Sequence, residues 1–246
     1  MFGRPRTAHL SVDDTIWLFK DLNEEEYTSA FEQPILGFFR TLHQKYGIAI
    51  SFYCFEEQDW MRLSAVTDRY QQELAESSGW LRFGFHARNE NVRYGEITPQ
   101  QAAADYAEVT AQLRRIVGRT LDECPRIHCY SASWPVLNAM HQEGLQGVLC
   151  SETDDDCYGL TPEKKLNIRT KGSYMDKQSK LVYLATDLRI EETNSILKKV
   201  IEQQRGHIEI FTHEWALNQE YVQEKIEICS SLLSRLGYQG GFWGER

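Results

Sequence analysis

The segment Thr7-Ala-His-Leu-Ser-Val-Asp-Asp-Thr15 indicates the fold, because it passes from a short apolar run directly into two adjacent acids. Thr7–Val12 predicts a buried strand, and Asp13 and Asp14 stand at its carboxyl end. Two like charges after a buried strand need a cation or a shared proton to coexist. Adjacent aspartates before a helix can also be simple helix caps, so this segment alone leaves both interpretations open.

The rest of the chain alternates between short apolar runs and amphipathic helical stretches. The further runs that we expect to be strands are Ile48–Phe55, Leu81–Phe85, Arg126–Tyr130, Gly147–Cys150, Leu181–Thr186, Ile208–Thr212 and Gly241–Trp243. Thr98-Pro99 is a typical helix start, with a capping residue before proline at the first helical position. Parallel strands need long crossover connections, so this order predicts a parallel sheet with helices outside.

The number of strand–helix units favours a closed arrangement over an open sheet. We expect an α/β fold, an irregular (β/α)7-8 barrel formed by residues 1–246 as a single domain. No Gly-x-Gly-x-x-Gly or Walker-type loop follows a predicted strand, which argues against nucleotide-binding doubly wound folds. Residues 151–180 depart from the rhythm, because they form a long polar stretch. Such a stretch inside a compact domain predicts a lid-like insertion.

Composition argues against several classes of function. The 27 basic side chains are scattered and outnumbered by 36 acidic ones, whereas a nucleic-acid binder usually carries a basic stripe. No apolar run approaches the ~20 residues that span a bilayer, and the N-terminus lacks the apolar core of a signal peptide. The six cysteines form no Cys-x-x-Cys pair. We therefore expect a reduced, cytoplasmic protein without a nucleic-acid or membrane partner; the sequence does not indicate its oligomeric state.

Polar side chains stand at the ends of other predicted strands as well. They are His86 after the third strand, His128 within the fourth, Asp187 after the sixth, and His213 and Glu214 after the seventh. The carboxyl ends of parallel barrel strands converge on one face, where active sites lie. Aspartates and histidines together at one rim are the donor set of a hydrolytic divalent-metal site. A single histidine near a strand end is more often structural, so this prediction depends on their coincidence.

Three segments resemble the motifs of polysaccharide deacetylases, carbohydrate esterase family four. His9–Thr15 is similar to the family's Thr-Phe-Asp-Asp-Gly signature, Phe83-Gly-Phe-His-Ala87 to its second motif, and Ile210-Phe-Thr-His-Glu-Trp215 to its last. The segments stand in the family's order along the whole chain. The resemblance implies a barrel of the glycoside hydrolase and deacetylase type. It also implies a metal-dependent hydrolase that removes an acyl group, such as acetyl, from an amino sugar or a polysaccharide precursor.

The resemblance further implies roles for individual residues and for a cofactor. Asp13 would be the general base and His213 the general acid. Asp14 and His86 would be ligands of one divalent metal ion, most simply zinc, and the partner would be a carbohydrate substrate.

The chain departs from the family pattern at the third metal ligand. The family has a second histidine four or five residues after the first, where this sequence has Glu90 and Asn91. The family's third motif begins with an arginine that steadies the base. Here that segment is Arg126-Ile-His-Cys-Tyr130, with His128 inside it. Glu90, His128 or a water molecule could complete the site, and a carboxylate would favour harder ions. The chain therefore resembles an outlying branch of the superfamily.

Other polar and aromatic residues are candidates for binding the substrate. Trp134 and Trp215 offer rings that can stack on a sugar face, although a core position is the alternative for at least one of them. Asp187, followed by Arg189 and Glu191, is expected either to orient a histidine or to form a surface salt bridge.

Two other functions fit the same residues. A metal-independent β/α-barrel glycosidase would need two carboxyl groups ~5–10 Å apart, such as Asp13 with Asp187 or Glu214. A catalytically inert barrel that only binds a glycan or a protein is the second alternative. The missing second histidine supports it, and the retained pair Asp13-Asp14 opposes it.

Overall fold

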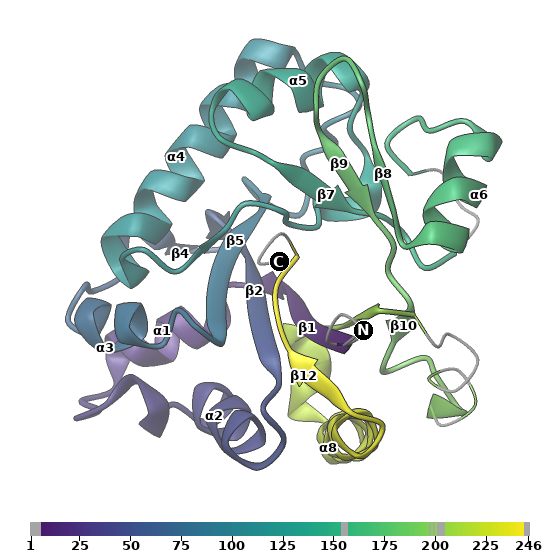
Figure 1. Cartoon of the computed structure of the whole chain (residues 1–246). Coiled ribbons are helices and arrows are strands. Elements are labelled where there is room, and N and C mark those ends of the chain that lie inside the picture. Colours follow the sequence, from purple (N-terminus) through teal and green to yellow (C-terminus); the bar gives the residue numbers. More distant parts are fainter. Residues whose placement is uncertain (1–5, 154–156, 197, 199, 201–204, 244–246) are drawn as a thin grey trace.

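The computed structural model describes residues 6–153, 157–196, 198, 200 and 205–243. Its centre is a sheet of parallel strands in the order β10-β11-β1-β2-β5-β6, with β12 paired to the start of β1 (Figure 1). These strands are β1 (Arg6–Thr15), β2 (Ala49–Phe55), β5 (Leu81–Ala87), β6 (Leu121–Asp122), β10 (Leu188–Arg189), β11 (His207–His213) and β12 (Tyr238–Gly240). Because β1 pairs Asp13 with His213 of β11, the first and last motifs end at the same rim.

A second, smaller sheet continues the barrel. In it β7 (Gly147–Leu149) and β9 (Val182–Leu184) are parallel, and β8 (Ser173–Met175) runs antiparallel to β9. The amide of Gln146 donates to the carbonyl of Glu123 at 2.8 Å, which joins this sheet to the chain after β6. On the other side the chain runs from β9 into β10, which pairs with β11. The prediction of an irregular β/α barrel is confirmed.

The helices lie outside the central sheet (Figure 1). The α-helices are α1 (Trp17–Glu24), α2 (Pro34–Tyr46), α3 (Gln71–Glu76), α4 (Pro99–Val117), α5 (Trp134–Gln142), α6 (Pro162–Lys171) and α8 (Glu220–Arg235). Short 3₁₀ turns are η1 (Ala30–Glu32), η2 (Leu63–Ala65), η3 (His128–Tyr130) and η4 (Glu214–Asn218). Thr98 caps α4 by accepting the amide of Gln101, as its sequence predicted. None of the helices within the described residues is long and apolar enough to cross a membrane.

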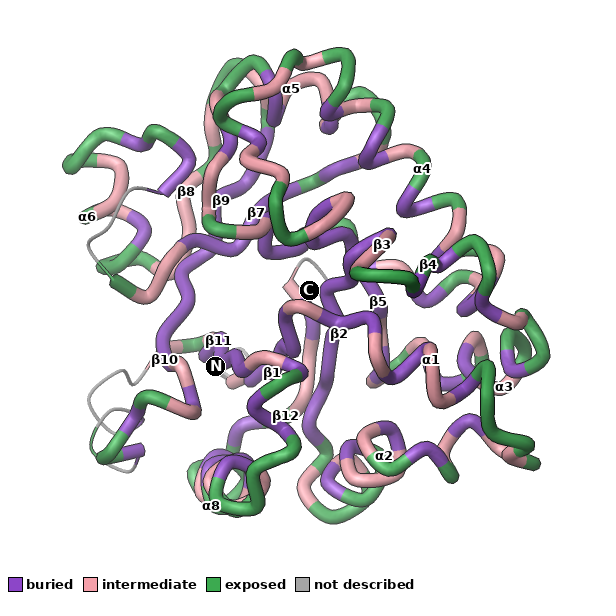
Figure 2. Tube along the Cα trace, turned by 180° about the vertical axis from the view of Figure 1, so that it is seen from behind, coloured by how far each residue is buried: buried purple, intermediate pink, exposed green. Residues whose placement is uncertain are grey.

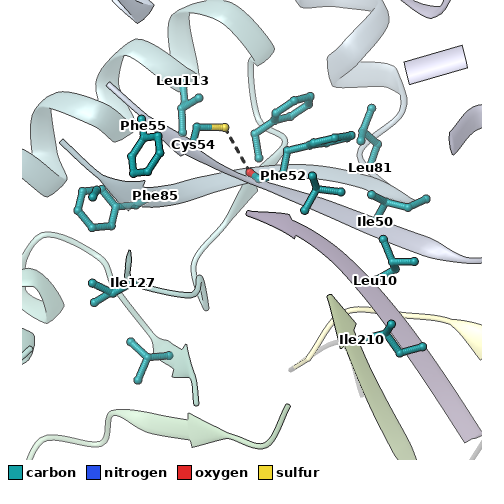
Figure 3. Packing of buried hydrophobic residues seen from close by; sticks show 14 of the residues in the cluster. Leu10, Ile50, Phe52, Cys54, Phe55, Leu81, Phe85, Leu113, Ile127 and Ile210 are labelled. Atoms are coloured by element: carbon teal, nitrogen blue, oxygen red, sulfur yellow. Dashed lines mark hydrogen bonds between the residues drawn. The ribbon is translucent and has the colours of Figure 1, made fainter. Parts of the chain in front are cut away.

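The apolar core lies between the strands and the helices around them. Every residue of β2 is buried, because the barrel interior covers one face of the strand and helices cover the other. Ile50 and Phe52 of this strand belong to the same buried cluster as Leu10, Leu81 and Leu113 (Figure 3). Figure 2 shows the same division, with buried residues along the central strands and exposed residues on the outer helices. This core fixes the strand ends that carry the polar side chains.

Two of the predicted strands are misplaced, and a third ends earlier than predicted. The segment Arg126–Tyr130 is not a strand, because it ends in the turn η3 (His128–Tyr130), where Cys129 and Tyr130 have positive φ angles of 55° and 52°. Asp187 does not end a strand either, since it lies between β9 and β10. The last strand is Tyr238–Gly240 and not Gly241–Trp243. Short apolar runs have this ambiguity, because a buried turn and a buried strand share the same composition.

The insertion at 151–180 contains regular structure. Thr161 caps α6 by accepting the amide of Lys164, and Gly172 ends that helix with a left-handed φ of 82°. After it, β8 adds an antiparallel edge to β9. Residues 154–156 lie outside the described residues. Within the described part of the insertion, Ser151–Thr153 line the cavity described below, and a lid function for the insertion stays a prediction.

Candidate metal centre

Three side chains converge at the carboxyl rim of the barrel. Asp14 comes from the end of β1, His86 from β5, and His128 from the first position of η3. The Oδ1 atom of Asp14 lies 3.1 Å from Nε2 of His86 and 3.5 Å from Nδ1 of His128. The two ring nitrogens are 3.2 Å apart. One carboxylate oxygen and two imidazole nitrogens this close together are a donor set for a zinc-like ion.

The backbone around Asp14 and His86 prepares both side chains for this arrangement. The pairing of β1 with β2 shifts register between Val12 and Thr15, and Asp14 has a left-handed φ of 58°. A non-glycine residue rarely adopts that conformation, and such residues gather at functional sites. The Nδ1–H of His86 donates to the carbonyl of Arg126 at 2.6 Å. The other ring nitrogen, Nε2, faces Asp14 and is the atom that is available to a metal ion.

The charge state of Asp14 follows from its neighbours. Burial acts to raise its pKa, but hydrogen bonds with His128 and His86 outweigh burial and hold the pKa well below its usual range. The Nε1–H of Trp215 donates to the second oxygen of Asp14 at 3.2 Å. The carboxylate is therefore ionised and fixed in orientation, as a ligand should be.

The structure brings His128, and not Glu90, to Asp14 and His86. Glu90 is exposed, and its carboxylate lies 3.5 Å from the amide nitrogen of Gln58. Its side chain is not part of the three-residue cluster, because the chain turns outward after β5. His128 reaches the cluster because the backbone reverses directly after it, at the left-handed residue Cys129.

Asp13 faces the other way, into a buried ion pair. The Nη1 atom of Arg126 donates to Oδ1 of Asp13 at 2.8 Å and to Oγ of Ser11 at 2.9 Å. Its Nη2 atom donates to Oγ1 of Thr186 at 3.0 Å, and its guanidinium packs 4.1 Å from the ring centre of Phe211. Arg126 is fully buried, so its ion pair with Asp13 is screened little by water. Asp13 is thereby held in one position beside the cluster.

His213 is fixed by an acid that follows β10. Its Nδ1 lies 2.5 Å from Oε1 of Glu191. The same oxygen accepts from Nε of Arg189, and the other oxygen, Oε2, accepts from the hydroxyl of Thr212. Burial acts to lower the pKa of His213, but the hydrogen bond with Glu191 and the charges of Asp13 and Asp14 outweigh it and raise the pKa. With Nδ1 occupied, Nε2 is the ring nitrogen that can exchange a proton with a ligand.

The cluster stands between two cavities. The first, of about 400 Å³, contains Asp13 and His213 and is also lined by Arg126, Tyr130, Glu152, Arg189 and Phe211. The second, of about 530 Å³, is lined by Trp17, Phe55, Gln58, Glu90, Asn91, Arg93 and Trp215. Asp14, His128 and Cys129 line both cavities. A ligand held at the cluster can therefore extend to either side of it.

Two other acidic candidates lie away from the cluster. Asp187 sits beside the amino half of β11, where it accepts the amide of Glu209 and pairs with Arg205 at 2.9 Å, and burial raises its pKa to about 6. Glu214 is buried and accepts three amides at the start of α1, from Ile16, Trp17 and Leu18. Neither acid lines the cavity that contains Asp13, because the carboxylate of each interacts with other parts of the chain inside the fold.

Of the two tryptophans predicted to contact a sugar, Trp215 lines one of the two cavities, and its role stays a prediction. Its indole stacks on the ring of His213 with 5.2 Å between centroids. Trp134 begins α5 and lines neither of the two cavities. The sequence interpretation overlooked Trp17, although it follows Asp14 by three positions, and it overlooked Ser11, which stands two residues before Asp13 on the same face of the strand.

Comparisons with known proteins bear on the fold. No protein-family model matches the sequence, and no curated protein matches it. A family 4 acetyl xylan esterase from Clostridium thermocellum, solved with a cobalt ion, superposes with a TM-score of 0.54 at 14% identity, over 96% of this chain and 87% of that one. A family 4 carbohydrate esterase pseudoenzyme from Bacillus anthracis gives 0.52 at 8% identity, over 96% of this chain and 63% of that one.

A protein of another activity has the same architecture. The 4-alpha-glucanotransferase from Thermococcus litoralis gives a TM-score of 0.55 at 12% identity, over 98% of this chain and 40% of that one. Identities this low establish a common fold and not a common activity. The chain thus has the irregular barrel found in family 4 carbohydrate esterases, and its resemblance to the polysaccharide deacetylase superfamily holds at the level of the fold.

Proposed function

We propose that this protein is a metal-dependent hydrolase that removes an acyl group, acetyl in the simplest case, from an amino sugar or a polysaccharide precursor. The observation that carries this proposal is the convergence of Asp14, His86 and His128 beside Asp13 and His213. Three ligands of mixed oxygen and nitrogen type, with a position left open for water or substrate, are typical of catalytic zinc sites.

The donor set fits a divalent ion. Because Nδ1 of His86 donates to the carbonyl of Arg126, Nε2 is the atom of His86 that would bind the ion, and the carboxylate of Asp14 is ionised. Nδ1 of His128 completes a triangle with sides of 3.1, 3.2 and 3.5 Å. When bound there, a divalent ion would polarise an acyl carbonyl and make hydroxide available near neutral pH.

Asp13 is the general base in this reaction. It lies next to Asp14 along the chain and lines the same cavity as the cluster. Arg126 orients its carboxylate, so that the free oxygen can take a proton from the attacking water without a search through rotamers. The neighbouring position of the base and the ligand in sequence places them at one reacting centre.

His213 is the general acid. Its raised pKa keeps the imidazolium populated at higher pH than an ordinary histidine would. Because Glu191 occupies Nδ1, the proton that reaches the leaving amine or alcohol comes from Nε2. Asp13 and His213 are neighbours in the β1–β11 register, so Asp13 can take a proton from the water and His213 can give its own proton to the leaving group within one cavity.

The metal-independent glycosidase is disfavoured by the positions of its carboxylates. Asp187 pairs with Arg205, and Glu214 accepts three backbone amides. Neither can then act with Asp13 as a pair of acids across a glycosidic bond. An inert glycan-binding barrel shares the fold but has no need of the oriented pairs Asp13–Arg126 and His213–Glu191.

The first test is metal content, measured by mass spectrometry on protein purified without chelator. We expect about one divalent ion per chain in the wild type, loss of the ion in His128→Ala, and retention in Glu90→Ala. The pair of variants separates the two candidate third ligands, and acetate release from acetylated sugars then tests the reaction. Wild-type protein that binds no ion after exposure to zinc, cobalt and manganese would rule out the proposal.

A further inference from the structure

Two buried cysteines meet where the insertion at 151–180 begins. Cys150 directly follows β7, and Cys157 stands after the next six residues of the chain. They are 5% and 3% exposed, and both are free thiols. The thiol of Cys150 donates a hydrogen bond to the sulfur of Cys157, and the amide of Ser151 donates to the same sulfur at 3.3 Å. Both cysteines line one small cavity of about 20 Å³, so the fold brings two free thiols into contact.

The two thiols differ in their readiness to react. Burial and the hydrogen bond with Cys157 raise the pKa of Cys150. The hydrogen bond from Cys150 lowers the pKa of Cys157 and outweighs burial, and the amide of Ser151 and the charge of Lys165 act in the same direction. The thiolate is the form of cysteine that attacks a disulfide. Cys157 is therefore the attacking residue of the pair, and Cys150 is in place to react with it afterwards.

The other cysteines are in different surroundings. Cys54, Cys124 and Cys229 are also buried, but burial raises the pKa of each of them. Buried thiols of this kind act as small apolar residues and are inert. Cys129 is exposed, and its pKa is raised as well. Of the six cysteines, all of which lie in the described part of the chain, Cys157 alone has a lowered pKa.

The pair lies behind one wall of the cavity that contains Asp13. Ser151 and Thr153 line both this cavity and the small one between the thiols. Glu152, which stands between them, lines the first cavity and accepts from the hydroxyl of Tyr130 at 3.4 Å. A bond between the two sulfur atoms would close a ring that contains these three wall residues. Because bonded sulfur atoms lie closer together than hydrogen-bonded ones, formation of the bond would move the wall.

We infer that Cys150 and Cys157 form a reversible disulfide, and that this bond alters the adjoining wall of the cavity that contains Asp13. The oxidant is a low-molecular-weight disulfide of the glutathione type. The Cys157 thiolate attacks one of its sulfur atoms, which forms a mixed disulfide and releases one thiolate. Cys150 then gives up its proton to solvent and attacks the sulfur of Cys157, which releases the second thiolate. Two protein thiols are oxidised while one disulfide is reduced, and excess thiol reverses the reaction.

The test counts free thiols at the two positions. The parent protein carries Cys129→Ser, because that exposed thiol would react by itself. It is compared with its Cys157→Ser derivative and with its Cys124→Ser derivative, a matched control at another buried thiol. The folded proteins are equilibrated with mixtures of reduced and oxidised glutathione, quenched with acid and alkylated. In the parent the tryptic peptide Ile127–Lys164 contains only Cys150 and Cys157, so its mass shows whether these thiols are free, joined or bound to glutathione.

We expect the peptide to lose both alkylation sites as the share of oxidised glutathione rises, in the parent and in the Cys124→Ser control, and to regain them with excess thiol. The Cys157→Ser derivative should keep Cys150 free. Free thiols at both positions over the whole range, or glutathione that stays attached to either of them, would overturn the inference. The parent protein alone gives this result, so a variant that fails to fold does not obscure it.

Acetate release tests the effect on the cavity, which is the part of the inference that rests on the proposed function. It is measured after removal of glutathione, because a thiol can remove a bound metal ion. We expect kcat/KM to fall severalfold in the oxidised parent and to recover after reduction. Equal values in the two states of an active enzyme would overturn the effect on the cavity and leave the proposed function standing. A bond that forms in a protein without acetate release would support the disulfide and count against the proposed function.

Discussion

The barrel interior and the barrel rim both contain buried or half-buried charges, but they use them differently. In the interior, His9 contacts Glu209 at 2.7 Å through Nδ1 and Ser51 at 2.9 Å through Nε2, and Ser51 donates to Asp122 at 2.6 Å. Each of these side chains is hydrogen-bonded to another side chain of the interior. At the rim, the donor atoms of Asp14, His86 and His128 instead converge on one another.

The comparison shows that burial of a histidine is a poor sign of function. His9 and His86 are both buried, yet both ring nitrogens of His9 are engaged by side chains of the interior. His86 uses one nitrogen to fix its tautomer and directs the other at a carboxylate. The candidate site differs from the interior in two respects. Its potential ligand atoms converge on one another, and the backbone at Asp14 is strained.

Arg126 contacts both the interior network and the rim. The largest effect on activity is expected from a change at its rim partner, Asp13. Asp13→Asn keeps the side-chain shape and an oxygen that accepts from Arg126, but it cannot take a proton. We expect kcat/KM to fall by roughly 10²–10⁴-fold with the metal retained. Activity is followed by acetate release and the metal by mass spectrometry. Activity within a factor of a few of the wild type would show that Asp13 is not the base.

Glu209→Gln is the matching change on the interior side of Arg126, 3.7 Å from its Nη2. Burial acts to raise the pKa of Glu209, but His9, His207 and Arg126 outweigh it and lower the pKa to about 2. The carboxylate therefore stabilises the fold above pH 4.5, and this contribution is lost as the pH falls towards 2. We expect Glu209→Gln to lower the free energy of unfolding by about 3 kcal/mol at neutral pH, measured by urea denaturation. A variant as stable as the wild type would contradict a structural role for the interior network.

The smallest expected effect is a shift in a pH profile. In Glu191→Gln the charge beside His213 is lost, so the pKa of His213 should fall. The acid must be protonated, and the activity of the variant should therefore decline at a lower pH than that of the wild type as the pH rises. The acidic side of the profile should move less. A profile with an unchanged basic side would separate His213 from the role of acid.

The sequence predicted the barrel and most of the rim for a physical reason. Apolar runs at regular intervals identify parallel strands, and parallel strands deliver their carboxyl ends to one face, so Asp13, Asp14, His86 and His213 could be expected together. Their chemical roles and the metal stay predictions. His128 was predicted as a candidate ligand, although the segment that contains it forms a turn and not a strand. Its place along the chain, after β5 and β6, brings it to the rim in either conformation.

The remaining misplacements come from tertiary structure that local pattern does not encode. Asp187 and Glu214 follow apolar runs as the site residues do, but Arg205 and the amides at the start of α1 bind them inside the fold. Asp187 lies away from the site because the chain between β9 and β10 places it beside Arg205.

The three-residue segment from Arg126 to His128 carries more of the site than its length suggests. The Arg126 side chain holds Asp13, the Arg126 carbonyl fixes the tautomer of His86, and His128 supplies a donor atom of its own. Insertion or loss of a single residue here would misplace all three together. Anyone grafting this site onto another barrel would have to transplant the segment as one unit, since each single substitution would restore only one of these three interactions.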